Sequence, residues 1–250
     1  MTVDNDWYKP GRTYKEEIEY FNTQAKIKGV SNVKLISLEW NVGPSENNDI
    51  SPNAFQCALI QSEMLMQFMD GNMDMAALWA FFWITKNTTP QFINRYLMNY
   101  YDNFRLLPCY DMFTLLAGAL NKQKCKVSCS TDAVYPLAVK NEENTEKVVF
   151  MMHKGSSESY VNIKAPKGEG FSLKIFSSDA ENPSVGSVKN APCIYDEITQ
   201  SYQFIIPAFS LAKLSINNSK SSGIYVSTSG NDENSGYSPA DAVRSIKKAV

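Results

Sequence analysis

The sequence predicts a mixed fold, an α/β part followed by an all-β part. Residues 1–121 alternate helix-like and strand-like patterns, an order typical of parallel strands joined by right-handed crossovers. Residues 122–219 carry short alternating segments between polar turns, which indicates an antiparallel β-sandwich. With 250 residues, 44% of them hydrophobic, the chain can fill one or two sizeable cores.

The α/β part begins with a helical pattern over residues 13–28, where apolar residues recur every three or four positions. The apolar run Val33–Trp40 then predicts a buried strand. A second helix is expected to begin with Ser51 as N-cap and Pro52 at its first position.

Met73–Ile84 predicts a second buried strand, and a last helix follows over Pro108–Leu120. Two clear strands, with a third possible at residues 1–4, are too few to close an eight-stranded barrel. The first 121 residues are therefore expected to be either the last two or three strands of a partial barrel or a smaller α/β fold.

Five strand-like segments are expected in the second part: Ala133–Val139, Val148–His153, Tyr160–Ala165, Phe171–Ser177 and Tyr202–Ile216. Because an antiparallel sheet can manage its own edges, we expect this sandwich to fold independently. Residues 217–223 are polar and predict a linker, and residues 224–250 begin a third pattern. The expected domains are thus 1–121, 122–219 and 220–250.

Composition excludes several classes of function. The net charge is −2 and no basic stripe is present, so nucleic acid is not an expected partner. No apolar run is long enough for a membrane span, and residues 1–4 lack the features of a signal peptide. Five cysteines cannot form a complete set of disulfides. The spacing of Cys125 and Cys129 loosely resembles that of a metal-binding pair, but packing of both side chains on one face of a strand is the better interpretation. No metal or cofactor is expected.

Polar residues end the first predicted strand, as Leu38-Glu39-Trp40-Asn41. Chemistry in parallel barrels is carried out at the C-terminal ends of the strands, which makes Glu39 the first catalytic candidate. The alternative is that Glu39 is an ordinary surface residue or N-cap. Trp40 could stack on a sugar or pack in a core, and Asn41 could bind a sugar hydroxyl or shape the turn.

This motif resembles the end of the seventh barrel strand in retaining (β/α)8 glycoside hydrolases of the α-L-arabinofuranosidase and β-agarase type. The likeness covers their C-terminal half and its β-sandwich. It implies that Glu39 is the nucleophile and that the acid/base lies on strand four, upstream of Met1. Aromatic residues at the end of strand eight stack on sugars in such enzymes, which makes Trp79, Phe82 and Trp83 candidates, with a core role for Trp79 as the alternative. Val3–Tyr8 resembles the end of strand six, without the histidine often found there.

Residues 224–250 resemble the entry of a right-handed parallel β-helix of secreted carbohydrate-active proteins. Together the resemblances imply part of a glycoside hydrolase for plant or algal polysaccharide, extracellular or periplasmic when intact and inactive as this piece alone. A non-catalytic carbohydrate-binding or adhesion protein with a degenerate barrel remnant is the main alternative. A small self-contained α/β domain unrelated to sugars is a third.

Overall fold

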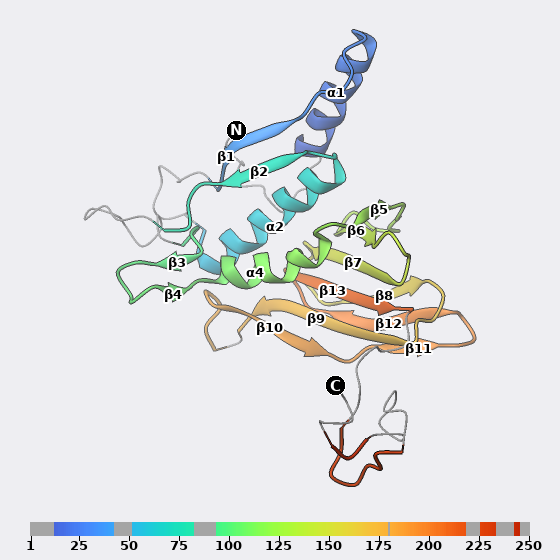
Figure 1. Ribbon diagram of the computed structural model, residues 1–250. Coiled ribbons are helices and arrows are strands. Elements are labelled where there is room, and N and C mark those ends of the chain that lie inside the picture. The colour runs from blue at the N-terminus through green and yellow to red at the C-terminus, as the bar shows by residue number, and fades with distance from the viewer. Residues whose placement is uncertain are drawn as a thin grey trace.

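A computed structural model describes residues 13–42, 52–82, 94–179, 181–218, 226–233 and 243–245 of the chain. The α/β part contains α1 (Thr13–Ile27), β1 (Ile36–Trp40), α2 (Ala54–Asp70), β2 (Met75–Leu78), β3 (Met98–Asn99), β4 (Arg105–Leu106) and α4 (Pro108–Leu116), followed by a 3₁₀ turn (Ala117–Ala119). β1 and β2 lie side by side and parallel, with α2 as the connection between them (Figure 1).

These elements follow the predicted order, and their bounds differ in informative ways. The two predicted strands are shorter than expected, since β1 begins at Ile36 and β2 ends at Leu78. Helix α2 is capped by Asn53 rather than Ser51, through a reciprocal pair of hydrogen bonds with Gln56. This capping box satisfies backbone donors that would otherwise lack a partner at the helix start.

The remaining strands form two antiparallel sheets. The six-stranded sheet has the order β10-β9-β13-β7-β6-β5, and the three-stranded sheet has the order β11-β12-β8. Their bounds are β5 (Gln123–Cys125), β6 (Val134–Lys140), β7 (Glu146–His153), β8 (Ser159–Lys164), β9 (Gly170–Ser178), β10 (Gly186–Ala191), β11 (Ile194–Asp196), β12 (Ser201–Ile206) and β13 (Ser210–Asn217). The predicted single segment Tyr202–Ile216 is thus two strands, which belong to different sheets.

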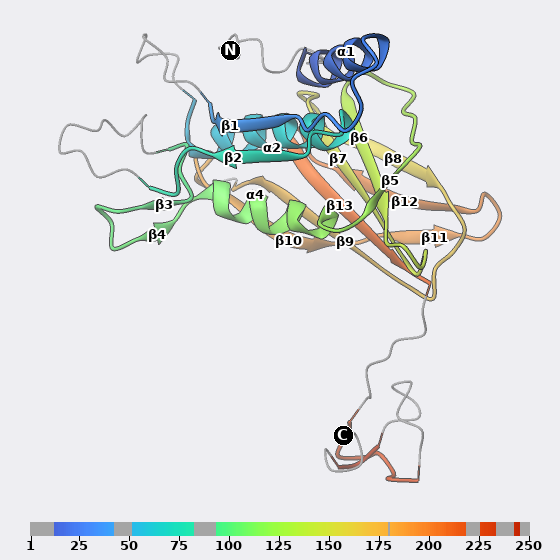
Figure 2. The same cartoon turned by 45° about the horizontal axis from the view of Figure 1, so that its top comes forward.

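The six-stranded sheet has an apolar core on each face. One core lies between the two sheets and includes Leu173, Tyr202 and Leu214. The other lies between the six-stranded sheet and helices α2 and α4, and includes Leu59 and Phe150. Figure 2 shows the two helices lying over the sheet. The α/β part and the six-stranded sheet therefore share the core that contains Leu59 and Phe150, which argues against our expectation that the sheets fold alone.

The structure bears only partly on three further expectations, which concern the C-terminal β-helix, the segment Val3–Tyr8 and membrane spans. In the C-terminal segment, Val226 and Val243 form a parallel bridge, and the β-helix remains a prediction. Val3–Tyr8 lies outside the described residues. None of the described helices is long and apolar enough to cross a membrane.

Candidate functional site

Glu39 lies exposed near the C-terminal end of β1, one residue before the strand's last position. The pairing of β1 with β2 is irregular around Glu39, because Ser37 lies opposite Ala76 whereas Trp40 lies opposite Leu78. Three steps along β1 thus match two steps along β2, so β1 contains one extra residue. Such bulges reset which side chains face each side of a sheet.

The extra residue determines which way the strand end faces. Leu35 and Trp40 are an odd number of positions apart, so a regular strand would place them on opposite faces. Both instead pack in the core that includes Phe68 of α2. Glu39 is exposed, and so are Ile36 and Leu38, which are 49% and 79% exposed.

Trp40 is a core residue. Its ring is 6% exposed and makes an edge contact with Phe68 at 5.4 Å between centroids, with Phe113 at 6.0 Å. These contacts favour the core role that was weighed for Trp40, which also lines the cavity along β1. Sugar stacking by Trp40 stays a prediction.

Asn41 uses its side-chain amide entirely within the protein. Its Nδ2 donates to the backbone carbonyls of Trp79 and Arg95, and its Oδ1 accepts from the Val42 amide at 2.7 Å and from Gln61 Nε2 at 2.6 Å. Two donors and two acceptor positions are all that an asparagine side chain has. The geometry favours the turn-shaping role over a direct contact with sugar.

Trp79 follows β2 and is 47% exposed, which is the reverse of the core role considered for it. Its backbone amide donates to the Trp40 carbonyl at 3.1 Å, so the ends of β1 and β2 are held together. Of the other two aromatic candidates, Phe82 is 39% exposed and Trp83 lies outside the described residues. Trp79 is thus an exposed aromatic candidate that lines the same cavity as Glu39.

Two buried polar residues that the sequence did not indicate support this corner. Arg95 is 8% exposed and donates from its Nη1 to the Val42 carbonyl at 2.6 Å. Gln61 is fully buried on α2 and donates to the Arg95 carbonyl at 2.8 Å. Neither follows a recognisable pattern in the sequence, because each acts through a backbone group far along the chain.

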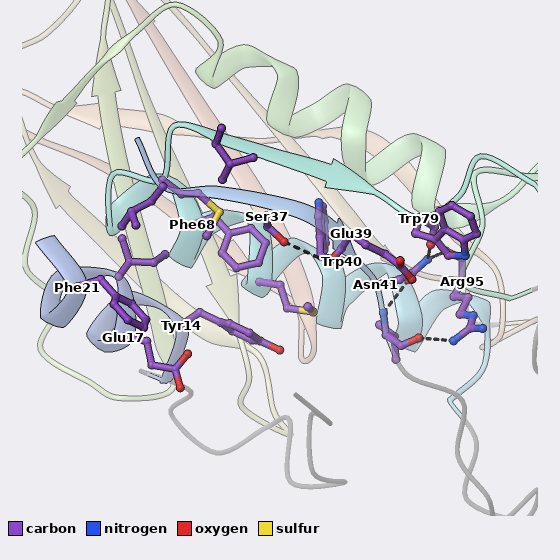
Figure 3. A pocket seen from close by; sticks show the side chains of 16 residues that line it. Tyr14, Glu17, Phe21, Ser37, Glu39, Trp40, Asn41, Phe68, Trp79 and Arg95 are labelled. Atoms are coloured by element: carbon purple, nitrogen blue, oxygen red, sulfur yellow. Dashed lines mark hydrogen bonds between the residues drawn. The ribbon is translucent and has the colours of Figure 1, made fainter. Parts of the chain in front are cut away.

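A cavity of about 730 Å³ runs along β1 between α1 and α2. Figure 3 shows Glu39, Asn41, Trp79 and Arg95 gathered at one end of it and Glu17 at the other. The lining between them is largely apolar, with Phe68 and Trp40 from the core. Among the described residues, no group of histidine, cysteine or acidic side chains is arranged to hold a metal ion.

Comparisons of this chain with known proteins find similar solved structures, but no matching family model and no matching curated sequence. No family model matches the chain, and no curated protein matches it. Similar solved structures include a GH30 endoxylanase from Clostridium papyrosolvens C71, with a TM-score of 0.53 and 14% identity over 78% of this chain and 44% of that chain. GH30 xylanase C from Talaromyces cellulolyticus has a TM-score of 0.57 and 10% identity over 81% and 50%.

The arabinose-bound α-L-arabinofuranosidase MgGH51 has a TM-score of 0.56 and 12% identity, over 84% of this chain and 35% of that chain. The chain therefore spans at most about half the length of these enzymes. At 10–14% identity, the likeness shows that the chain shares part of the fold of glycoside hydrolases.

Proposed function

We propose that this chain is part of a retaining glycoside hydrolase that acts on plant or algal polysaccharide, with Glu39 as the nucleophile. The observation that carries the proposal is the position of Glu39, which is exposed near the C-terminal end of a parallel strand and lines the cavity along that strand. Catalytic residues of parallel barrels occupy such strand ends.

In this role Glu39 attacks the anomeric carbon and forms a covalent glycosyl-enzyme, while a second carboxyl group protonates the leaving oxygen. Water then releases the sugar with the second group acting as base. Retention requires the two carboxyl groups to stand about 5–5.5 Å apart. Glu17 is the other carboxylate that lines the cavity, and it lies at the opposite end. The acid/base is therefore proposed to come from another barrel strand.

We propose further that β1 and β2 are the last two strands of a (β/α)8 barrel. On β1, Ile36 and Leu38 are large apolar side chains left 49% and 79% exposed, whereas strands of parallel barrels are normally covered on both faces. The cavity along β1 adds unfilled space beside the same strand. Strands from the rest of a barrel would cover the exposed side chains of Ile36 and Leu38 and would fill the cavity along β1.

Trp79 is the proposed sugar platform, because its half-exposed ring follows β2 beside the strand that carries Glu39. Asn41 and Arg95 act as positioning residues, since their hydrogen bonds hold the ends of both strands. A polysaccharide substrate fits an extracellular or periplasmic location, which is part of the same proposal. The narrower α-L-arabinofuranosidase or β-agarase type and the C-terminal β-helix are proposed on the sequence resemblance alone.

The test is the turnover of Glu39→Gln in a protein that carries a complete barrel. Because the amide cannot form the covalent intermediate, kcat on an aryl glycoside should fall by about 10³-fold or more. Glu16→Gln, which changes an exposed glutamate of α1, is the matched control and should leave kcat unchanged. Near-normal turnover of Glu39→Gln would remove Glu39 from the mechanism.

The second candidate is a non-catalytic carbohydrate-binding or adhesion protein. It is favoured by the separation of Glu17 from Glu39, which leaves no assigned acid/base in the cavity. The two functions differ in a simple assay. A protein with a complete barrel that binds polysaccharide but releases no reducing ends would support the second.

A further inference from the structure

Two lysines lie directly opposite each other on neighbouring strands of the six-stranded sheet. Lys213 of β13 pairs with Lys174 of β9, and directly opposite residues have their Cβ atoms about 4.5–5.5 Å apart. Both side chains are on the face that carries the helices, because Leu211 and Phe176, two positions away on each strand, pack in the core with α2 and α4. Like charges directly opposite each other destabilise a sheet, so this pair needs a compensating charge.

The ammonium group of Lys213 is partly buried beneath the 3₁₀ turn that ends α4. A side chain at Gly118, in this turn, would collide with Nζ and Cε of Lys213, so the glycine leaves the space that the ammonium group occupies. The C-terminal end of a helix carries partial negative charge. That charge attracts one ammonium group, but it does not account for a second lysine directly opposite.

A third lysine, Lys122, belongs to the same group, and we call Lys122, Lys174 and Lys213 the lysine cluster. Burial and the ammonium groups of Lys174 and Lys122 lower the pKa of Lys213 below its ordinary value, and the Glu146 carboxylate acts against them. Glu146 is already paired with Lys122, at 3.1 Å. Within the described part of the chain, neither Lys174 nor Lys213 has a carboxylate as an ion-pair partner. The cluster therefore has an excess of positive charge at a partly buried position.

We propose that the lysine cluster binds an oxyanion group, a carboxylate or a sulfate, carried by a polysaccharide. An oxyanion between Lys174 and Lys213 would replace their mutual repulsion by attraction, and each ammonium group can donate charge-assisted hydrogen bonds to it. The side chain of Lys174 is exposed, which leaves the site open to solvent. The choice of a polysaccharide as the source rests on the proposed function, and a free inorganic anion is the other source of the same chemistry.

The cluster is separate from the cavity that Glu39 lines, because none of its three lysines is among the residues that line that cavity. Helix α4 begins directly after β4, whereas the cluster lies beneath the turn at the other end of the helix. The site would thus hold a charged chain away from the reacting bond, and binding there does not need Glu39.

The test is affinity electrophoresis of the 250-residue chain at low salt, in native gels that contain polygalacturonate, ι-carrageenan or uncharged arabinoxylan. We expect retardation by at least one of the two charged polymers. Lys174→Met/Lys213→Met should weaken that binding about tenfold or more. Lys174→Arg keeps the charge and should bind normally. Glu39→Gln should also bind normally, so that loss of the catalytic role alone leaves this proposal standing.

Lys164→Met/Lys189→Met is the matched control, because it removes the same charge at two exposed lysines outside the cluster. Lys189 is on the same sheet but pairs with Ile175, which packs in the core on the opposite face. This control should bind like the unmodified chain.

Thermal unfolding in sodium sulfate or sodium chloride, at equal ionic strength, separates binding from a structural role. In chloride, Lys174→Met/Lys213→Met should unfold at the same temperature as the unmodified chain or above it, because the repulsion is gone. Sulfate should raise the midpoint of the unmodified chain more than that of this variant. Such a difference without retardation by either polymer would support the oxyanion site with a free anion as its source.

Three results would overturn the proposal. The first is equal retardation of Lys174→Met/Lys213→Met and its matched control. The second is a lower midpoint of Lys174→Met/Lys213→Met in chloride, which would make the lysines structural. The third is an unmodified chain that neither polymer retards and that sulfate stabilises no more than the variant.

Discussion

Glu63 of α2 and Lys154, which follows β7, form a buried ion pair with Oε1 and Nζ 2.9 Å apart. The two residues are 6% and 7% exposed. Gln67 Nε2 also donates to Glu63 Oε1, at 3.1 Å. The pair joins a helix of the α/β part to the six-stranded sheet, so it helps to fix how the two pack.

Removing one partner of this pair should be far more harmful than removing both. Lys154→Met leaves the Glu63 carboxylate buried beside an apolar chain, and should lower the free energy of unfolding by about 3–5 kcal/mol. Glu63→Leu combined with Lys154→Met should recover most of that loss. Urea denaturation of the single and double variants gives the coupling energy directly. Additive losses would show that the two side chains do not act as a pair.

Asp70, at the end of α2, is a second tie between the two parts. Its carboxylate binds Lys15 of α1 at 2.7 Å, Lys124 of β5 at 3.2 Å and the Tyr135 hydroxyl of β6 at 2.8 Å. Burial alone would raise the pKa of Asp70, but the hydrogen bonds from these three groups outweigh it and lower the pKa below the ordinary value.

A lowered pKa in the folded protein means that ionised Asp70 stabilises the fold above the ordinary aspartate pKa of about 3.9. That stabilisation is lost as the pH falls through the lower folded-state pKa. Asp70→Asn should therefore reduce the free energy of unfolding at pH 7 by about 1–3 kcal/mol, with a smaller deficit in acid. Asp132→Asn, at an exposed position, is the control. A deficit that stays constant from pH 7 to acid would contradict the assignment.

The shared core predicts that the two sheets need their helices. Alone, residues 122–219 would expose the face of Leu137, Val148 and Phe150, which are all nearly fully buried against α2 and α4. We expect that piece to aggregate or to bind the dye ANS strongly, as compact states with exposed apolar surface do. A cooperative thermal transition without ANS binding would show that the two cores separate cleanly.

The cysteines should differ sharply in reactivity. All five are free thiols. Burial raises the pKa of Cys57 to about 12, and burial raises the pKa of Cys109 well above its ordinary value. Cys129 is exposed. Because the thiolate is the reactive form, DTNB should modify Cys129 first in the native protein and reach Cys57 and Cys109 only after unfolding. Rapid native labelling of Cys57 would contradict its burial.

Sequence patterns predicted the order of the main elements because periodic apolar residues report local structure. They also placed Glu39 at a strand end. The sequence patterns failed at the end of β1, where one extra residue changes which side chains face the core. This bulge places Trp40 in the core, and periodicity alone did not reveal the extra residue. The start of α2 was also predicted wrongly, since Ser51 was expected as the N-cap and the capping box with Gln56 makes Asn53 the N-cap.

Long-range polar contacts could not be predicted from the sequence, for a different reason. Glu63 and Lys154 lie 91 positions apart, and neither shows a local pattern that names the other. The β3–β4 hairpin was missed because strands of two residues are too short to show alternation. Both features became visible only once the parts of the chain were packed together.

The most direct test of the central claim is covalent labelling of the nucleophile. In a protein with a complete barrel, a 2-deoxy-2-fluoro glycoside with a good leaving group should form a glycosyl-enzyme that turns over slowly. Peptide mass spectrometry should then find the sugar on the peptide that contains Glu39, and Glu39→Gln should remain unlabelled. A label on a different carboxylate, with Glu39 unmodified, would contradict the account.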